Sequence, residues 1–182
     1  MRRVLALLGV ISACAVAEAR PGRNTSQVSI CGVSLRIPAG WEVRSRPPEP
    51  GALCAAEILP RALAASDADS VPRYVLTVAR ERRSFEDAAE AAGFRKGDSG
   101  WVVLGRQGTE SPAEESPSPQ GRMLRGTALI GWSGSGDRYQ GLADNPRAVI
   151  SHGEHTLTFT GGPETDLVLD EIVRSLSWRG RW

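Results

Sequence analysis

The densest group of side chains that could do chemistry is His152-Gly153-Glu154-His155. Two imidazoles and a carboxylate are ligands that zinc accepts, but a catalytic zinc site needs three protein ligands on rigid elements. Gly153-Glu154 is instead typical of a hairpin tip, and two histidines three residues apart are not the helical pair of a zinc hydrolase. We therefore expect a solvated turn without a bound metal, with a small metal-dependent hydrolase using His152 and His155 as the alternative.

Three further motifs resemble catalytic or nucleotide-binding signatures only in part. Gly97-Asp98-Ser99-Gly100 resembles the nucleophile loop of trypsin-like proteases, yet both histidines follow this serine, whereas that family has its histidine before it. Gly131-Trp132-Ser133-Gly134-Ser135 lacks the final glycine of a nucleophile elbow. In the stretch beginning at Gly134, Tyr139 stands where a dinucleotide fingerprint has its last glycine. We expect polar turns at all three, no catalytic residue and no cofactor.

The three cysteines predict one disulfide. Cys14 lies in an N-terminal segment that we expect to be processed, which leaves Cys31 and Cys54 as the intramolecular pair. Both lie beside β-prone segments joined by a proline-rich loop, and neighbouring antiparallel strands bring Cβ atoms within bonding reach. Two buried free thiols are the alternative. A zinc or redox role is disfavoured because the chain has no Cys-x-x-Cys.

Residues 1–19 have the pattern of a secretion signal peptide. Arg2 and Arg3 precede an uncharged stretch over residues 4–17, which suits a signal h-region but is short for a membrane span. The small residues of Ala17-Glu18-Ala19 predict cleavage between Ala19 and Arg20, with Ala15 and Ala17 as nearby alternatives. The protein is therefore expected to be periplasmic or secreted, where disulfides persist.

A second interpretation of the same segment is a bacterial lipobox. Ile11-Ser12-Ala13-Cys14 would then make Cys14 the lipidated N-terminus of an outer-membrane lipoprotein. We favour ordinary cleavage, because this cysteine lies early and isoleucine is not the preferred first residue. No later stretch is apolar enough to span a membrane, so a membrane anchor is expected only through Cys14.

Charge excludes non-specific nucleic-acid binding as a function. The 182-residue chain has a formal net charge of +1. Loss of Arg2, Arg3 and Glu18 with the signal leaves it neutral, without the positive field that such binding needs.

After a polar leader at residues 20–27, the pattern over 28–182 predicts a single α+β domain with a mainly antiparallel sheet flanked by helices. Alternating or β-prone runs predict most of the strands. These runs are 28–30, 33–37, 41–43, 53–59, 74–79, 101–104, 123–132, 139–142, 148–150 and 156–159. Ser84 is placed to cap a helix that Gly93 ends, and residues 166–176 form an amphipathic helix with Leu169 and Ile172 on its apolar face.

Other segments are expected on the surface. Residues 108–120 are rich in Ser, Pro and Glu and predict a solvated loop. Residues 61–73 fit either a short helix or a hairpin loop. The basic run from Arg80 to Arg83 is expected to be a solvated face. Trp132, Tyr139 and Trp178 could anchor a binding partner, although packing against the sheet is the interpretation that we prefer.

Several of these segments resemble the PsbP-like family, which includes DcrB-like envelope proteins. The resemblance rests on Val33-Ser34-Leu35-Arg36-Ile37-Pro38-Ala39-Gly40-Trp41, on Arg125-Gly126-Thr127, on Thr156-Leu157-Thr158-Phe159 and on residues 170–176. It covers roughly residues 28–178 and implies a central antiparallel sheet with helices packed against it. It also implies a module that works by binding, with no shared catalytic residues.

Together these observations predict a bacterial, non-enzymatic module that binds another protein in the periplasm or outside the cell. Recognition would use one sheet face or the loops beside it. A sharper version is an inhibitor or immunity protein for an envelope-acting toxin or hydrolase, with residues 108–120 as the inserted element. The alternatives are the metal-dependent hydrolase and the lipid-anchored envelope protein.

Overall fold

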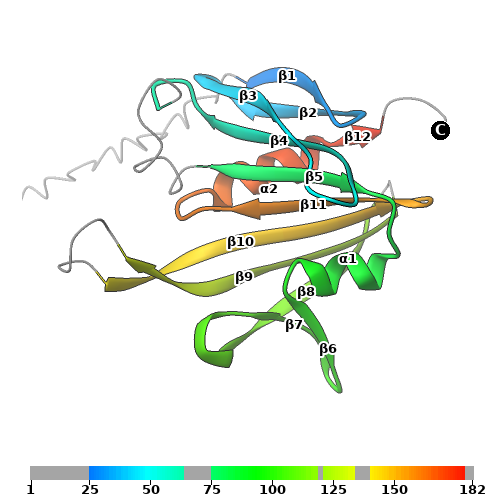
Figure 1. Ribbon diagram of the computed structural model, residues 1–182, viewed down its shortest axis with the longest axis vertical. Coiled ribbons are helices and arrows are strands. Elements are labelled where there is room, and N and C mark those ends of the chain that lie inside the picture. The colour runs from blue at the N-terminus through cyan, green and yellow to red at the C-terminus, as the bar shows by residue number, and fades with distance from the viewer. Residues whose placement is uncertain (1–24, 64–74, 119–120, 134–139, 179–182) are drawn as a thin grey trace, which may run out of the picture.

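The computed structural model describes residues 25–63, 75–118, 121–133 and 140–178 (Figure 1). Along the chain its elements are β1 (Thr25–Ile30), β2 (Val33–Pro38), β3 (Trp41–Arg46), β4 (Ala52–Pro60), β5 (Leu76–Glu81), α1 (Phe85–Ala91), β6 (Phe94–Gly97), β7 (Gly100–Leu104), the 3₁₀ helix η3 (Arg106–Gly108), β8 (Glu110–Ser118), β9 (Gly121–Ser133), β10 (Gln140–His152), β11 (His155–Gly161), α2 (Asp166–Ser175) and β12 (Ser177–Trp178).

The predicted α+β class is wrong, because the described residues are mostly strand and form a sandwich-like arrangement of two antiparallel sheets. The large sheet has nine strands in the order β3-β4-β5-β11-β10-β9-β8-β7-β6, and the small one has the order β1-β2-β12. The β1–β2 hairpin is not part of the large sheet but packs on one of its faces. A second sheet therefore covers part of a face where the prediction placed helices. Most of the predicted runs lie in strands, but residues 140–142 and 148–150, predicted as parts of separate strands, belong to one strand, β10, and β6 and β12 were not predicted.

The main core lies between the two sheets. Val33, Leu35 and Ile37 of β2 are at most 1% exposed and pack with buried residues of β4, β5, β10 and β11. Helix α2 closes the same face of the large sheet and contributes Leu169 and Ile172, both fully buried. The predicted amphipathic helix and its apolar face are thus confirmed.

A second core lies on the opposite face of the large sheet. There α1 lies against β9 and β10, and the β6–β7 hairpin, at the edge of the sheet beyond β8, contributes Phe94, Trp101 and Val103 to the same core (Figure 1). Consecutive residues of β10 serve different cores, Val149 this one and Ile150 the main one, because side chains alternate across a strand. The β9–β10 pair is therefore buried on both faces.

Helix α1 begins and ends as its sequence predicts. The Ser84 hydroxyl accepts a hydrogen bond from the Asp87 amide at 3.1 Å. After the last helical turn Gly93 takes a φ of 81°, a conformation that glycine adopts without steric cost. The half-buried Arg147 guanidinium donates to the Ala92 carbonyl at 2.8 Å, which satisfies one of the free carbonyls at this helix end.

The segment expected to be a loop at 108–120 is instead mostly strand β8. Residues Glu110 to Pro112 pair with β7, and residues 113–118 pair with β9. Each part of β8 therefore has a strand on one side only. This explains why Pro112 and Pro117, which have no N–H to donate, are accepted in a strand.

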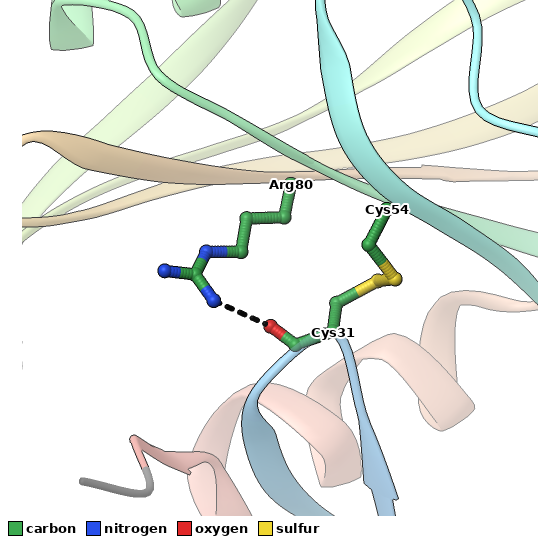
Figure 2. Close-up of a disulfide and its surroundings, with 3 residues drawn as sticks. All are labelled: Cys31, Cys54 and Arg80. Carbon is green, nitrogen blue, oxygen red and sulfur yellow. Dashed lines mark hydrogen bonds between the residues drawn. A yellow bond between two sulfur atoms is a disulfide. The ribbon is translucent and has the colours of Figure 1, made fainter. Parts of the chain in front are cut away.

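The predicted disulfide between Cys31 and Cys54 is present, with Cα atoms 5.5 Å apart (Figure 2). Cys31 lies in the turn between β1 and β2, and Cys54 lies in β4. The bond therefore joins the small sheet to the large one, at the end of the molecule that also holds the β10–β11 hairpin.

Some predictions fall outside the described residues. These are the signal peptide with its cleavage site, Cys14, Tyr139, and most of residues 61–73, of which only 61–63 are described, as a turn. Within the described ranges, none of the helices combines the length and apolar character needed to cross a bilayer.

Candidate functional site at the β10–β11 hairpin

The His152-Gly153-Glu154-His155 segment forms the predicted hairpin turn. His152 and His155 are paired across β10 and β11, so both side chains project from the same face of the large sheet. Gly153 at the first turn position has a φ of 58°, as a type II′ turn requires. This face is the one that carries the main core, and the histidines lie at its end.

Trp178 of β12 lies against this pair. Its ring stacks on the His152 imidazole, with centroids 4.9 Å apart and planes 19° from parallel. The Arg80 guanidinium lies 5.6 Å from the centroid of the same indole ring, a cation–π arrangement. Trp178 is partly buried and packs against the main core, as preferred from the sequence, and its ring also contacts His152 and Arg80 of this site.

The prediction for Arg80 is wrong, because this side chain is buried and is not part of a solvated face. It is 7% exposed and donates a hydrogen bond to the Cys31 carbonyl at 3.3 Å (Figure 2). Burial lowers its pKa from the usual arginine value. The signal that could have revealed this is the alternation of β5, since Leu76, Val78 and Arg80 share one face.

His155 experiences a positive field. Its pKa is lowered from the usual histidine value by burial and then by the charges of Arg80 and Arg82, against smaller opposing effects of Glu154 and of the Glu81 backbone. Its Nδ1 atom is buried and has no hydrogen-bond partner among the described residues. Burial and two neighbouring cationic side chains therefore both disfavour the protonated form of this ring.

Leu53 is the apolar member of the group and was not singled out from the sequence. The β4–β5 register shifts between Ala52 and Cys54, which makes Leu53 the extra residue of a β-bulge. Bulges redirect side chains and are frequent beside binding sites. Leu53 is 57% exposed, one of only three exposed large hydrophobic residues in the part of the chain that the structure describes.

These side chains enclose a hollow of about 680 Å³. It is open to solvent on one side and bounded by β4, β5 and the β10–β11 hairpin. Its lining residues are Leu53, Arg80, Arg82, His152, Gly153, Glu154 and His155. We call this feature the hairpin hollow. It combines an exposed apolar group with cationic groups, and the Trp178 ring contacts two of its lining residues, His152 and Arg80.

The metal-dependent hydrolase is not supported by this geometry. Across the described ranges, no group of three His, Cys, Asp or Glu side chains is placed to hold a metal ion. Arg80 and Arg82 also oppose the approach of a cation to His155, by the same repulsion that lowers its pKa. The hydrolase remains an untested alternative, and metal analysis of the exported protein would test it.

The protease-like motif at Gly97-Asp98-Ser99-Gly100 lies away from this hairpin. Ser99 is in the turn that joins β6 and β7 at the far edge of the large sheet, a hairpin without a histidine. The glycine-rich stretch after β9 lies outside the described residues, and so does the side chain of Trp132.

Comparison with protein-family models and with curated proteins finds no match for this chain. The resemblance to PsbP-like proteins therefore stays a prediction.

Proposed function

We propose that this protein is an extracytoplasmic, non-enzymatic module that binds another protein through the hairpin hollow. The observation that carries the proposal is Leu53, which a β-bulge exposes at the rim of a hollow lined by Arg80 and His152, both of which contact the Trp178 ring. Binding energy at protein interfaces concentrates in a few residues, with Trp and Arg over-represented.

The surroundings of the hollow support a preformed site. The disulfide joins the β1–β2 turn to β4, and Arg80 donates to the carbonyl of the same Cys31 (Figure 2). Trp178 is held between Arg80 and His152. Side chains that are already fixed lose less entropy when a partner binds, so such a surface contributes more to affinity than a flexible one.

The cysteines and the N-terminal residues support an extracytoplasmic compartment. A disulfide is compatible with an oxidising, extracytoplasmic location. Together with the signal-like residues 1–19, it favours the periplasm or secretion. Within this proposal the partner is a toxin or hydrolase of the cell envelope, and the protein acts as its inhibitor or immunity protein. Lipidation at Cys14 would tether the same module to a membrane.

Site-specific photo-crosslinking tests the proposal. A photoreactive amino acid replaces Leu53 in the exported protein, and a matched variant carries it at Leu167, which lies on α2 and is 62% exposed. We expect irradiation of envelope extract to give a discrete adduct from position 53 and none of the same mass from position 167. Arg82→Glu in the position 53 variant should reduce its yield.

Equal adducts from both positions would indicate non-specific capture and contradict the proposal. Absence of any adduct from position 53 in extract from the native host would contradict it as well.

A further inference from the structure

Two arginines at the end of strand β5 bring positive charge into the hairpin hollow. Arg80 is the last-but-one residue of β5, and Arg82 follows that strand directly. His155 lies beside both, and their charges lower its pKa after the larger effect of burial. The potential where these three side chains meet is therefore positive. The remaining lining residues are Leu53, His152, Gly153 and Glu154, of which only Glu154 is acidic.

A carboxylate of the chain itself already lies at this place. The Glu154 side chain approaches Arg82 at 3.6 Å across the hairpin turn. Both side chains are well exposed, at 69% for Arg82 and 80% for Glu154, so water screens the pair and it is weak. Glu154 therefore shows how a carboxylate sits at the rim and is itself easily displaced.

From this geometry we infer that the hairpin hollow binds one carboxylate group presented by the partner protein, an Asp or Glu side chain that takes the place of Glu154 beside Arg82 and His155. The inference rests on the proposed function and specifies the chemistry of the partner. Leu53 would contact apolar atoms next to that carboxylate, as the stem of a glutamate provides.

Charge balance favours a carboxylate over a phosphate group. Two arginines and one glutamate line the hollow, and Glu154 stays in the turn even when its side chain moves aside, so these three groups keep a single net positive charge. A monoanion matches this charge, whereas a dianionic phosphate would bring an excess negative charge against Glu154. Arginine also pairs well with the planar carboxylate through two parallel N–H donors.

The test uses a small probe in place of the unidentified partner. N-acetylglutamate α-amide is titrated into the purified, disulfide-bonded protein at constant ionic strength, and NMR signals of the His155 ring and the Gly153 amide report binding. The matched neutral probe is N-acetylglutamine α-amide, and inorganic phosphate forms a third arm. We expect a saturable shift with the carboxylate probe, none with the neutral one, and weaker binding of phosphate.

Two substitutions should act in opposite directions. Arg82→Gln should weaken probe binding by about two- to fivefold, the range expected for an exposed charge pair. Glu154→Gln should strengthen binding by a similar factor, because it removes the competing carboxylate. Arg174→Gln on α2, at a side chain that is 76% exposed, is the control and should leave binding unchanged.

The inference is overturned by the absence of a saturable shift, by tighter binding of phosphate, or by equal effects of Arg82→Gln and Arg174→Gln. If any of these occurs while the crosslink from position 53 persists, the carboxylate chemistry is wrong and the binding module stands. If the probe binds as expected while the crosslink fails, the anion site stands and the protein-binding function is wrong.

Discussion

At the scale of single residues, Arg80 shows how this protein accommodates a buried cation. Its position on the apolar face of β5 requires the guanidinium to lie under the β1–β2 turn. A carbonyl oxygen from Cys31 and the face of the Trp178 ring offset part of the hydration that it loses. The side chain thereby links both sheets at the hairpin hollow, where the sequence alone indicated an ordinary solvated arginine.

The lowered pKa of His155 makes a prediction about stability and pH. Above the unfolded-state pKa of about 6.5 the imidazole is neutral in both states and has no effect. As the pH falls below that value, the unfolded chain takes up a proton that the folded protein resists. The free energy of unfolding must therefore decrease until the pH passes the folded-state pKa.

Urea denaturation of the wild type and of His155→Gln, at pH values from 7.5 to 5, checks this. The wild type should lose stability relative to the variant as the pH decreases, and taking the difference cancels groups common to both proteins. A constant difference across this range would show that Arg80, Arg82 and burial do not disfavour the imidazolium.

At the scale of elements, the helices were predictable because their signals are local. Ser84 and Gly93 lie at the ends of α1 in sequence and in space, and the apolar stripe of α2 is readable within ten residues. Strand β8 was not predictable in this way. Its Pro- and Ser-rich sequence has low strand propensity, and its backbone is paired because β7 and β9 supply partners from elsewhere in the chain.

Helix α2 offers a matched pair of substitutions. Leu169 is buried in the core and 0% exposed to solvent, whereas Leu167 is 62% exposed. Leu169→Ala should lower the free energy of unfolding by about 2–5 kcal/mol through lost burial and the cavity that remains. Leu167→Ala should change it by less than about 0.5 kcal/mol. Chemical denaturation measures both, and equal effects would mean that α2 does not pack as the structure has it.

At the scale of the whole molecule, sequence patterns indicated the strands but not their division between sheets. The alternation in Val33-Ser34-Leu35-Arg36-Ile37 shows that one face is buried without showing what covers it. The β1–β2 hairpin continues along the chain into β3, yet it pairs with β12 at the other end of the sequence. Such long-range pairing decides between a sheet flanked by helices and two stacked sheets. Local periodicity does not contain that information.

The candidate site likewise has features that the sequence predicted and features that it did not. The hairpin turn and the disulfide followed from spacing and from cysteine parity. The convergence of Leu53, Arg80 and Trp178 required three segments that are distant in sequence. The bulge at Leu53 is a matter of register between β4 and β5, which no composition signal marks.

The disulfide should contribute substantially to the stability of this two-sheet arrangement. Cys31 and Cys54 are 23 residues apart, and closing a loop of this size disfavours the unfolded chain by about 3 kcal/mol in the chain-entropy model. We expect Cys31→Ser with Cys54→Ser to lose a free energy of unfolding of this order in urea denaturation. Intact mass after thiol alkylation confirms the bond in the parent.

A second double variant distinguishes the effect of losing the disulfide from the cost of the left-handed backbone conformation at Cys31. This residue has a φ of 50° and precedes Gly32 at 80°, the two left-handed positions of a type I′ turn, for which Asn-Gly is preferred. Cys31→Asn with Cys54→Ser also lacks the bond but relieves the backbone conformation. It should therefore be more stable than the double serine variant by about 0.5–1 kcal/mol.

If both double variants were as stable as the parent, the bond would not hold the sheets together. If they were equally destabilised, the left-handed backbone at this turn would carry no cost.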